Sequence, residues 1–179
     1  MSAPSKSIQS TQNWLKDFVI DLGLCPFAAQ PYMKNRIRFK EVEFKESIDG
    51  FSTFYDEMML LDQKKEIETT LLIIPQLSSS FTDYLDFFHG CEDVIHHYKK
   101  EEEYQLASFH PEYVFQGEDP DDPSVYTNRS PFAIVHILRF DMVAHAIESH
   151  PDTEGIPDKN IQTMRTMGLM TLKERLRNY

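Results

Sequence analysis

Residues 69–75, with the sequence TTLLIIP, restrict the fold of this chain more than any other segment. The run is apolar at successive positions, without the alternation of a strand that is half exposed to water. Helical and polar segments lie on both sides of it in the sequence. It therefore predicts a strand in the middle of a sheet, with other elements packed on each face.

Alternation of apolar residues predicts three further strands, at residues 36–44, 104–110 and 131–139. In the first of these strands the alternation slips, because Ile37 and Phe39 share one parity while Val42 and Phe44 share the other. A bulge near Lys40 would bring both pairs to the same face of the sheet.

Apolar residues recur at every third or fourth position in the segments that are expected to be helical. Ser10 is expected to cap the first helix and Gly23 to end it, and Ser80 with Asp83 gives the third helix a capping-box-like start. The expected helices lie at residues 10–22, at residues 51–64, from residue 80, and twice after the last strand, where the final helix begins near Asp158 and continues through Gly168 to Leu176.

The predicted fold is α/β (or α+β): a single layered domain with a mixed four-stranded sheet, three strands parallel and one antiparallel, flanked by helices. The order of elements implies two right-handed crossovers, which would make the first three strands parallel to one another. Residues 1–9 are expected to form a flexible tail and residues 10–179 one globular domain. A chain of 179 residues is long enough for one such domain.

The charge of the chain limits its partners. Lys and Arg total 18 against 29 Asp and Glu, so the surface field is negative and disfavours nucleic acid and anionic lipid. The apolar runs are much shorter than the roughly 20 residues that span a bilayer. The first residues lack the apolar stretch of a secretory signal, and two cysteines are too few for a disulfide scaffold. We therefore expect a cytoplasmic protein with no membrane and no nucleic-acid partner; the sequence sets no oligomeric state.

A long polar loop, residues 111–127, separates the last two strands and is flanked by His110 and by Asn128, Arg129 and Ser130. If the last strand returns antiparallel, these residues meet at one edge of the sheet, beside the ends of two other strands. Such edges are the usual ligand sites of layered sheets, and loops of this length are often functional. The loop is therefore expected to be the wall or lid of a cleft.

Each residue of this edge has two interpretations. His110, held extended by the following proline, suits acid–base work, or it hydrogen-bonds the loop backbone. Arg129 offers a planar fork to a carboxylate or phosphate, or it pairs with loop acids, and Asn128 and Ser130 either bind substrate or bond neighbouring backbone groups.

Cys25, in the segment GLCPFA, is the cysteine placed for reactivity, because Pro26 suits the start of a new turn whose N–H groups would favour a thiolate. The alternative is a small buried residue, which is also the interpretation of Cys91 on the third helix. No nucleotide loop or zinc spacing is present, so we expect no cofactor and no metal.

Several motifs in order, among them LCPFA, ETTLLIIP, YQLASFHPEYVF and TNRSPFAIVHILR, resemble the uncharacterised bacterial family catalogued as domain of unknown function 1415. The resemblance extends from Trp14 to about Gly168. It implies no established reaction, substrate or cofactor. It does draw attention to the segment from His136 to Arg139, in addition to the residues named above.

Two functions follow from these residues. The first is an enzyme that acts on an anionic small molecule, with Cys25 or a water molecule as nucleophile, His110 as base, and Asn128, Arg129 and Ser130 holding the substrate. The second is a non-catalytic domain that binds an anionic metabolite or an acidic segment of a partner. The position of Cys25 relative to His110 distinguishes them.

Overall fold

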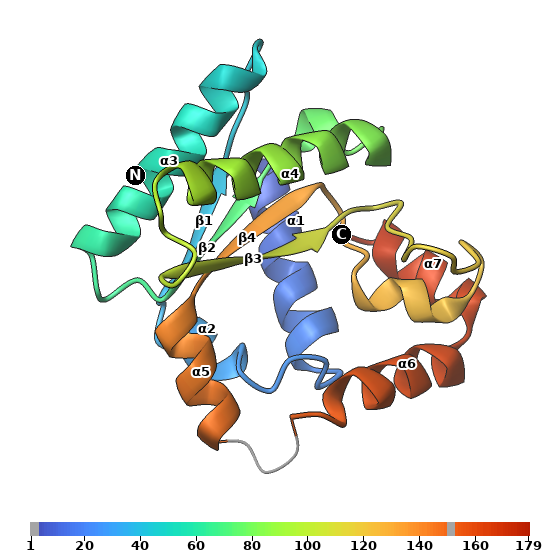
Figure 1. The fold of residues 1–179 in the computed structure, drawn as a ribbon. Coiled ribbons are helices and arrows are strands. Elements are labelled where there is room, and N and C mark those ends of the chain that lie inside the picture. Colours follow the sequence, from blue (N-terminus) through green and yellow to red (C-terminus); the bar gives the residue numbers. More distant parts are fainter. Residues whose placement is uncertain (1–3, 150–152) are drawn as a thin grey trace.

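Strand β2 lies inside the sheet, with all five of its residues buried. The computed structural model describes residues 4–149 and 153–179, so residues 1–3 of the expected tail lie outside the described residues (Figure 1). In the described part of the chain the strands form one four-stranded sheet in the order β1-β2-β4-β3. The strands are β1 (Ile37–Glu41), β2 (Thr69–Ile73), β3 (Tyr104–Phe109) and β4 (Ile134–Arg139).

The prediction of three parallel strands and one antiparallel strand is wrong for the pairing of neighbouring strands, although β1, β2 and β3 do run in one direction and β4 runs in the other. Strands β1 and β2 are the one parallel pair, while β2 pairs with β4 and β3 pairs with β4 in antiparallel fashion. The cause is the position of β4, which enters between β2 and β3 and keeps them apart. Ile134, Val135 and Ile137 of β4 are fully buried, so a central position covers both faces of this strand.

No bulge interrupts β1, contrary to the sequence prediction. Its register with β2 is continuous from the pair Ile37–Thr69 to the pair Glu41–Ile73. The change of parity has another cause: Ile37 and Phe39 pack against one face of the sheet, and Val42 packs against the other. Both parities are apolar because helices cover both faces.

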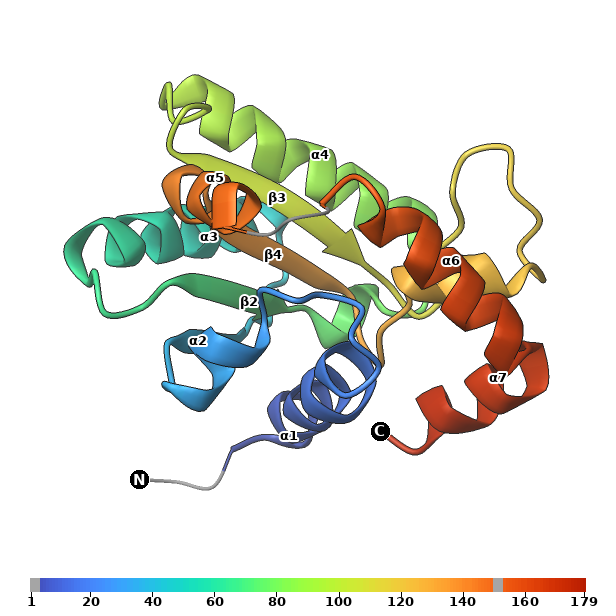
Figure 2. The same ribbon diagram turned by 90° about the horizontal axis from the view of Figure 1, so that it is seen from below.

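Helices cover the two faces of the sheet (Figure 2). Helices α3 and α4 lie on one face, and α1 and α2 lie on the other, with α6 and α7 beside the end of the sheet (Figures 1 and 2). Their bounds are α1 Lys6–Trp14, α2 Ala29–Met33, α3 Ser47–Gln63, α4 Phe81–His97, α5 Phe140–Ser149, α6 Ile156–Met167 and α7 Leu169–Arg177, with short helical turns η1 Leu15–Ile20, η2 Pro75–Leu77 and η3 Pro123–Thr127.

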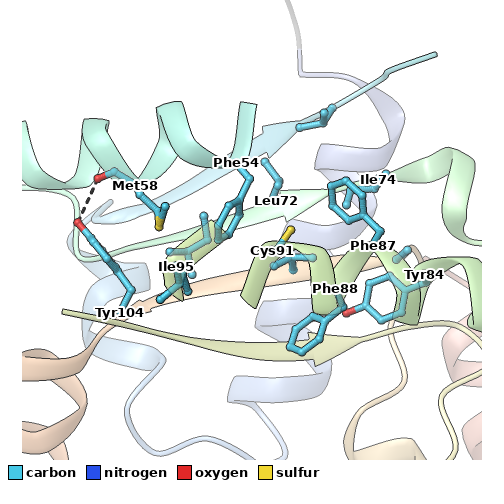
Figure 3. Packing of buried hydrophobic residues seen from close by; sticks show 14 of the residues in the cluster. Phe54, Met58, Leu72, Ile74, Tyr84, Phe87, Phe88, Cys91, Ile95 and Tyr104 are labelled. Carbon is cyan, nitrogen blue, oxygen red and sulfur yellow. Dashed lines mark hydrogen bonds between the residues drawn. The ribbon is translucent and has the colours of Figure 1, made fainter. Parts of the chain in front are cut away.

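The core under α3 and α4 follows the predicted helical stripes (Figure 3). Phe54 and Met58 of α3 are fully buried against β2, and Cys91 of α4 is equally buried, as predicted. The hydroxyl of Ser80 accepts a hydrogen bond from the backbone N–H of Asp83 (3.2 Å), which confirms the predicted cap. Burial raises the pKa of the Cys91 thiol well above its usual range, so this cysteine is a packing residue.

The first helix begins earlier than its sequence predicts. Ser5, not Ser10, caps α1, and the helix continues into the π-helical segment η1. Ser10 instead lies buried on the inner face of α1. Gly23 follows the helical segment with a φ of 67°, as expected for a residue that ends a helix in the left-handed region.

The expected last helix is divided into α6 and α7 at Gly168. This residue has φ 78° and ψ 151°, a conformation that is almost restricted to glycine and that breaks a helix. Met164 and Leu172, one on each side of the break, are both fully buried. The apolar spacing that predicted one helix therefore belongs to two helices that pack on the same core.

Candidate functional site

The ends of three strands meet at one edge of the sheet. Ile73 of β2 and Phe109 of β3 both pair with Ile134 of β4, so the carboxyl ends of β2 and β3 lie beside the amino end of β4. The backbone N–H of His110 donates to the carbonyl of Asn128 (3.2 Å), which joins the two sides of the long loop. The residues that flank the loop are thus close together. Most of their side chains, however, are engaged in contacts that stabilise the protein itself.

The imidazole of His110 is fully buried and hydrogen-bonded at both nitrogens. Its Nδ1 accepts from the backbone N–H of Glu112 (3.0 Å), so the proton is on Nε2, which donates to the carbonyl of Leu77 (3.0 Å). The ring also packs against Phe81 and Tyr84 of α4. Burial lowers the pKa of His110, which favours the neutral ring. These contacts are those of a residue that holds the loop backbone.

Asn128 and Arg129 also bond the backbone of the loop. The Nδ2 of Asn128 donates to the carbonyl of Ser108 (3.1 Å). Arg129 donates to the carbonyls of Tyr113 (3.2 Å) and Pro120 (3.1 Å), and its guanidinium lies 4.6 Å from the centre of the Tyr126 ring. The guanidinium group therefore binds the loop backbone at two points, and Arg129 is only partly exposed to water.

The loop is further attached to the C-terminal helices. Arg165 of α6 makes a two-pronged ion pair with Asp122 (3.0 and 3.3 Å), and Lys173 of α7 lies 3.3 Å from Asp121. Arg165 lowers the pKa of Asp122 to about 2, helped by the N–H of Ser124. The loop is consequently a fixed wall of the molecule.

A cavity of about 570 Å³ that is open to solvent lies at this edge of the sheet, between the loop, α1 and α7. Ser130 and Phe132 line it from the strand side, and Tyr126 lines it from η3. The hydroxyl of Ser130 donates to the carbonyl of Phe132 (2.5 Å), which leaves its oxygen as an acceptor only. Among the residues of the predicted site, Ser130 is the one in the lining of this cavity.

Three cations line the cavity: Lys6 from α1, and Lys173 and Arg177 from α7; Glu112 is the acid that lines it. This balance reverses that of the whole chain, which has 18 basic against 29 acidic residues. Sequence reasoning missed all three cations. Lys173 and Arg177 are one helical turn apart, and this spacing in the sequence could have indicated a basic helix face. That Lys6 lines the same cavity depends on the fold and cannot be read from the sequence.

Cys25 does not join His110. Leu24, beside it, packs in the core under α1 and α7, and the Leu24 carbonyl accepts from Asn160 (2.8 Å), whereas the ring of His110 packs against α4. In the described residues no hydrogen bond links the two side chains. Burial raises the pKa of the half-buried Cys25 thiol, and the N–H groups of Phe27 and Ala28 only partly offset this effect.

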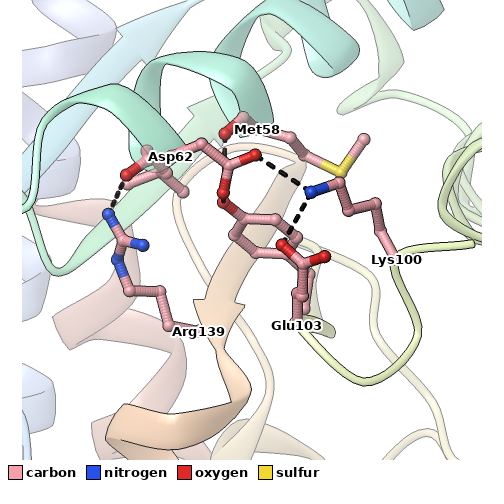
Figure 4. Close-up of polar contacts among 7 residues, drawn as sticks. Met58, Asp62, Lys100, Glu103 and Arg139 are labelled. Carbon is pink, nitrogen blue, oxygen red and sulfur yellow. Dashed lines mark hydrogen bonds and ion pairs between the residues drawn. The ribbon is translucent and has the colours of Figure 1, made fainter. Parts of the chain in front are cut away.

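The polar groups of His136 and Arg139, both on β4, are bonded to other groups of the protein. His136 Nε2 lies 2.7 Å from the hydroxyl of Thr69, and burial lowers the pKa of this histidine to about 4. At the opposite end of the sheet the Arg139 guanidinium donates to the backbone carbonyls of Leu61, Lys64 and Ile67, beside the polar cluster of Asp62, Lys100, Glu103 and Tyr104 (Figure 4). Arg139 therefore caps the C-terminal end of α3 and the turn that follows it.

Residues 4–149 and 153–179 offer neither a metal-ligand cluster nor a membrane-spanning helix. These residues contain no cluster of three or more His, Cys, Asp or Glu side chains that could hold a metal ion. Among the same residues, no helix combines the length and the apolar character needed to cross a membrane.

Comparisons with curated proteins and with solved structures gave no match. The comparison with family models matched residues 6–174 to the family described as Protein of unknown function (DUF1415). The match begins at the cavity residue Lys6 and includes Lys173, while Arg177 lies beyond it. Because the match covers nearly all of the 179 residues, the chain belongs to the DUF1415 family.

Proposed function

We propose that this protein binds a small anionic molecule in the cavity between the loop, α1 and α7, without chemical conversion of that molecule. The observation that carries the proposal is the lining: Lys6, Lys173 and Arg177 converge on one cavity in a chain with a large excess of acids. The volume of about 570 Å³ is within the range of small-molecule sites, roughly 300–1,000 Å³.

The fold supports this location because the cavity has fixed walls. One wall is the loop, which is held by His110, Arg129 and the Asp122–Arg165 ion pair. The other is α7, whose Leu172 is fully buried and whose Arg175 donates to the carbonyl of Asp17 (3.2 Å). The backbone of such walls loses little conformational entropy when a ligand binds, so the ordering cost falls on the cationic side chains.

An enzyme with Cys25 as nucleophile and His110 as base remains a hypothesis, but no contact favours it over binding. Both nitrogens of His110 are bonded to backbone groups, and the pKa of Cys25 is raised by burial. Nucleophilic catalysis requires a base within hydrogen-bond reach of the nucleophile and a stabilised thiolate. The binding hypothesis needs neither.

Isothermal titration calorimetry of the full chain with small carboxylates and phosphates tests the proposal. Arg177→Gln should weaken the binding of the best anion about 5- to 50-fold, which corresponds to the loss of one charged hydrogen bond. Lys159→Gln is the matched control, because it removes the same charge from an exposed position of α6 outside the cavity. Equal losses in both variants would show that binding is a non-specific effect of charge.

A further inference from the structure

We infer that the ligand of this cavity is a phosphate monoester with an apolar body, rather than a carboxylate or a free inorganic anion. This inference rests on the proposed function and names the class of molecule that the same cavity takes. It depends on three features of the lining: the helices that carry the cations, the apolar residues between them, and the existing partner of Lys173.

The cations come from two sides of the cavity. Lys6 is the first residue of α1, while Lys173 and Arg177 lie one turn apart on α7 and extend from the same face of that helix. A carboxylate has two oxygens in one plane. A phosphate monoester has three terminal oxygens arranged around phosphorus and a charge near −2 at neutral pH, so it can accept from donors on two sides at once.

Apart from the three cations, Glu112 and Ser130, the lining is apolar or aromatic. Phe132 and Pro131 form the strand side, Leu176 of α7 lies between the two α7 cations in the sequence, and the buried Tyr126 belongs to η3. An inorganic phosphate ion would leave most of a cavity of about 570 Å³ filled with water. A ring or short chain attached to the phosphate would bury this apolar surface and gain affinity from it.

Lys173 is already in contact with an acid. Its Nζ lies 3.3 Å from Asp121 Oδ1, and the Asp121 carboxylate is largely exposed. Exposed ion pairs of this kind are weak, so a phosphate dianion can compete for Lys173. In contrast, Lys6 and Arg177 have no ion pair or side-chain hydrogen bond among the described residues. Removal of the Asp121 charge should therefore increase affinity for the phosphate.

Calorimetry with phenyl phosphate, inorganic phosphate and benzoate tests the class of ligand. We expect phenyl phosphate to bind about 10-fold or more tightly than either of the other two, because it alone combines the dianion with the ring. Its affinity should fall severalfold between about pH 7.5 and about pH 5, as the phosphate passes through its second pKa of about 6, while benzoate stays ionised. Asp121→Asn should raise the affinity for phenyl phosphate about 2- to 3-fold, which is the effect of one weak surface pair.

The possible negative results separate the inference about the ligand class from the proposed function. If inorganic phosphate or benzoate binds as tightly as phenyl phosphate, and Arg177→Gln still weakens that binding, the ligand class is wrong while anion binding in this cavity stands. If no anion binds in a way that depends on Arg177, the proposed function fails together with the inference. Thermal melts of Arg177→Gln and Asp121→Asn, both at exposed positions, check that the variants are folded.

Discussion

The imidazole of His110 donates its Nε2 proton to the backbone carbonyl of Leu77, 3.0 Å away, and so ties the end of β3 to the turn that follows β2. The same ring accepts from the backbone of Glu112 at its other nitrogen (3.0 Å). A histidine with both nitrogens occupied by backbone groups has no free position for proton transfer. Its main contribution is to hold the strand ends and the loop in their observed positions.

Replacement of His110 by alanine should therefore destabilise the fold. The change leaves the carbonyl of Leu77 and the N–H of Glu112 without their side-chain partner, and it opens a space against Phe81 and Tyr84. We expect a loss of about 2–4 kcal/mol in urea unfolding. His89→Ala, at an exposed position of α4, should change the free energy by less than about 0.5 kcal/mol. A His110→Ala protein as stable as the wild type would contradict the structural role.

His136 should make stability depend on pH. Burial lowers its pKa to about 4 in the folded chain, against about 6.5 in the unfolded chain. The unfolded state therefore binds more protons below about pH 6.5, so this contribution is complete above that pH and is lost as the pH falls towards 4. The free energy of unfolding lost through this group is at most about 3–4 kcal/mol. Urea unfolding across this pH range should show that the free energy of unfolding falls more steeply for the wild type than for His136→Gln. Parallel curves for the two proteins would contradict this role of His136.

Cys25 should react slowly. Burial raises the pKa of its thiol, so the thiolate fraction near neutral pH is smaller than that of a free cysteine. Labelling with a disulfide reagent at pH 8, with Cys91→Ala as the background to remove the second thiol, should be slower than labelling of a small free thiol. A rate above that of the free thiol would indicate a stabilised thiolate and would restore the nucleophile hypothesis.

Gly168→Ala should destabilise the chain through its backbone. At φ 78° and ψ 151° an alanine is strained, although no atom lies within 4 Å of the added methyl group. We expect a cost of about 1–3 kcal/mol in thermal or urea unfolding. A D-alanine introduced at the same position by semisynthesis suits a positive φ and should recover most of this loss. Equal destabilisation by both enantiomers would point to a steric cause instead.

The sequence was sufficient for features that depend on local pattern. The double-sided apolar strand β2, the Ser80 cap and the buried Cys91 each follow from residues that are neighbours in the chain or on one helix face. The position of β4 between β2 and β3 was not predictable in this way. Strand order depends on how a long connection crosses the sheet, and the 24 residues between Phe109 and Ile134 allow more than one course.

The four residues expected at the sheet edge do lie together there, but the lining of the proposed cavity was not predicted. His110, Asn128, Arg129 and Ser130 meet at one end of the sheet, yet only Ser130 adjoins the cavity there. Lys6 and Arg177 are near opposite ends of the sequence and carry no motif. Their convergence is a property of the packing of α1 and α7, and no pattern within one segment reports it.

A titration of ¹⁵N-labelled protein with phenyl phosphate, followed by two-dimensional NMR, locates the binding site residue by residue. We expect saturable shifts of the amides of Ser130, Phe132, Lys173 and Arg177, which belong to the cavity, and little change around Cys25. Arg177→Gln should reduce the fitted affinity, and Lys159→Gln should not. Absence of saturable shifts at these four residues, or saturable shifts centred on Cys25, would contradict the assignment of this cavity as the binding site.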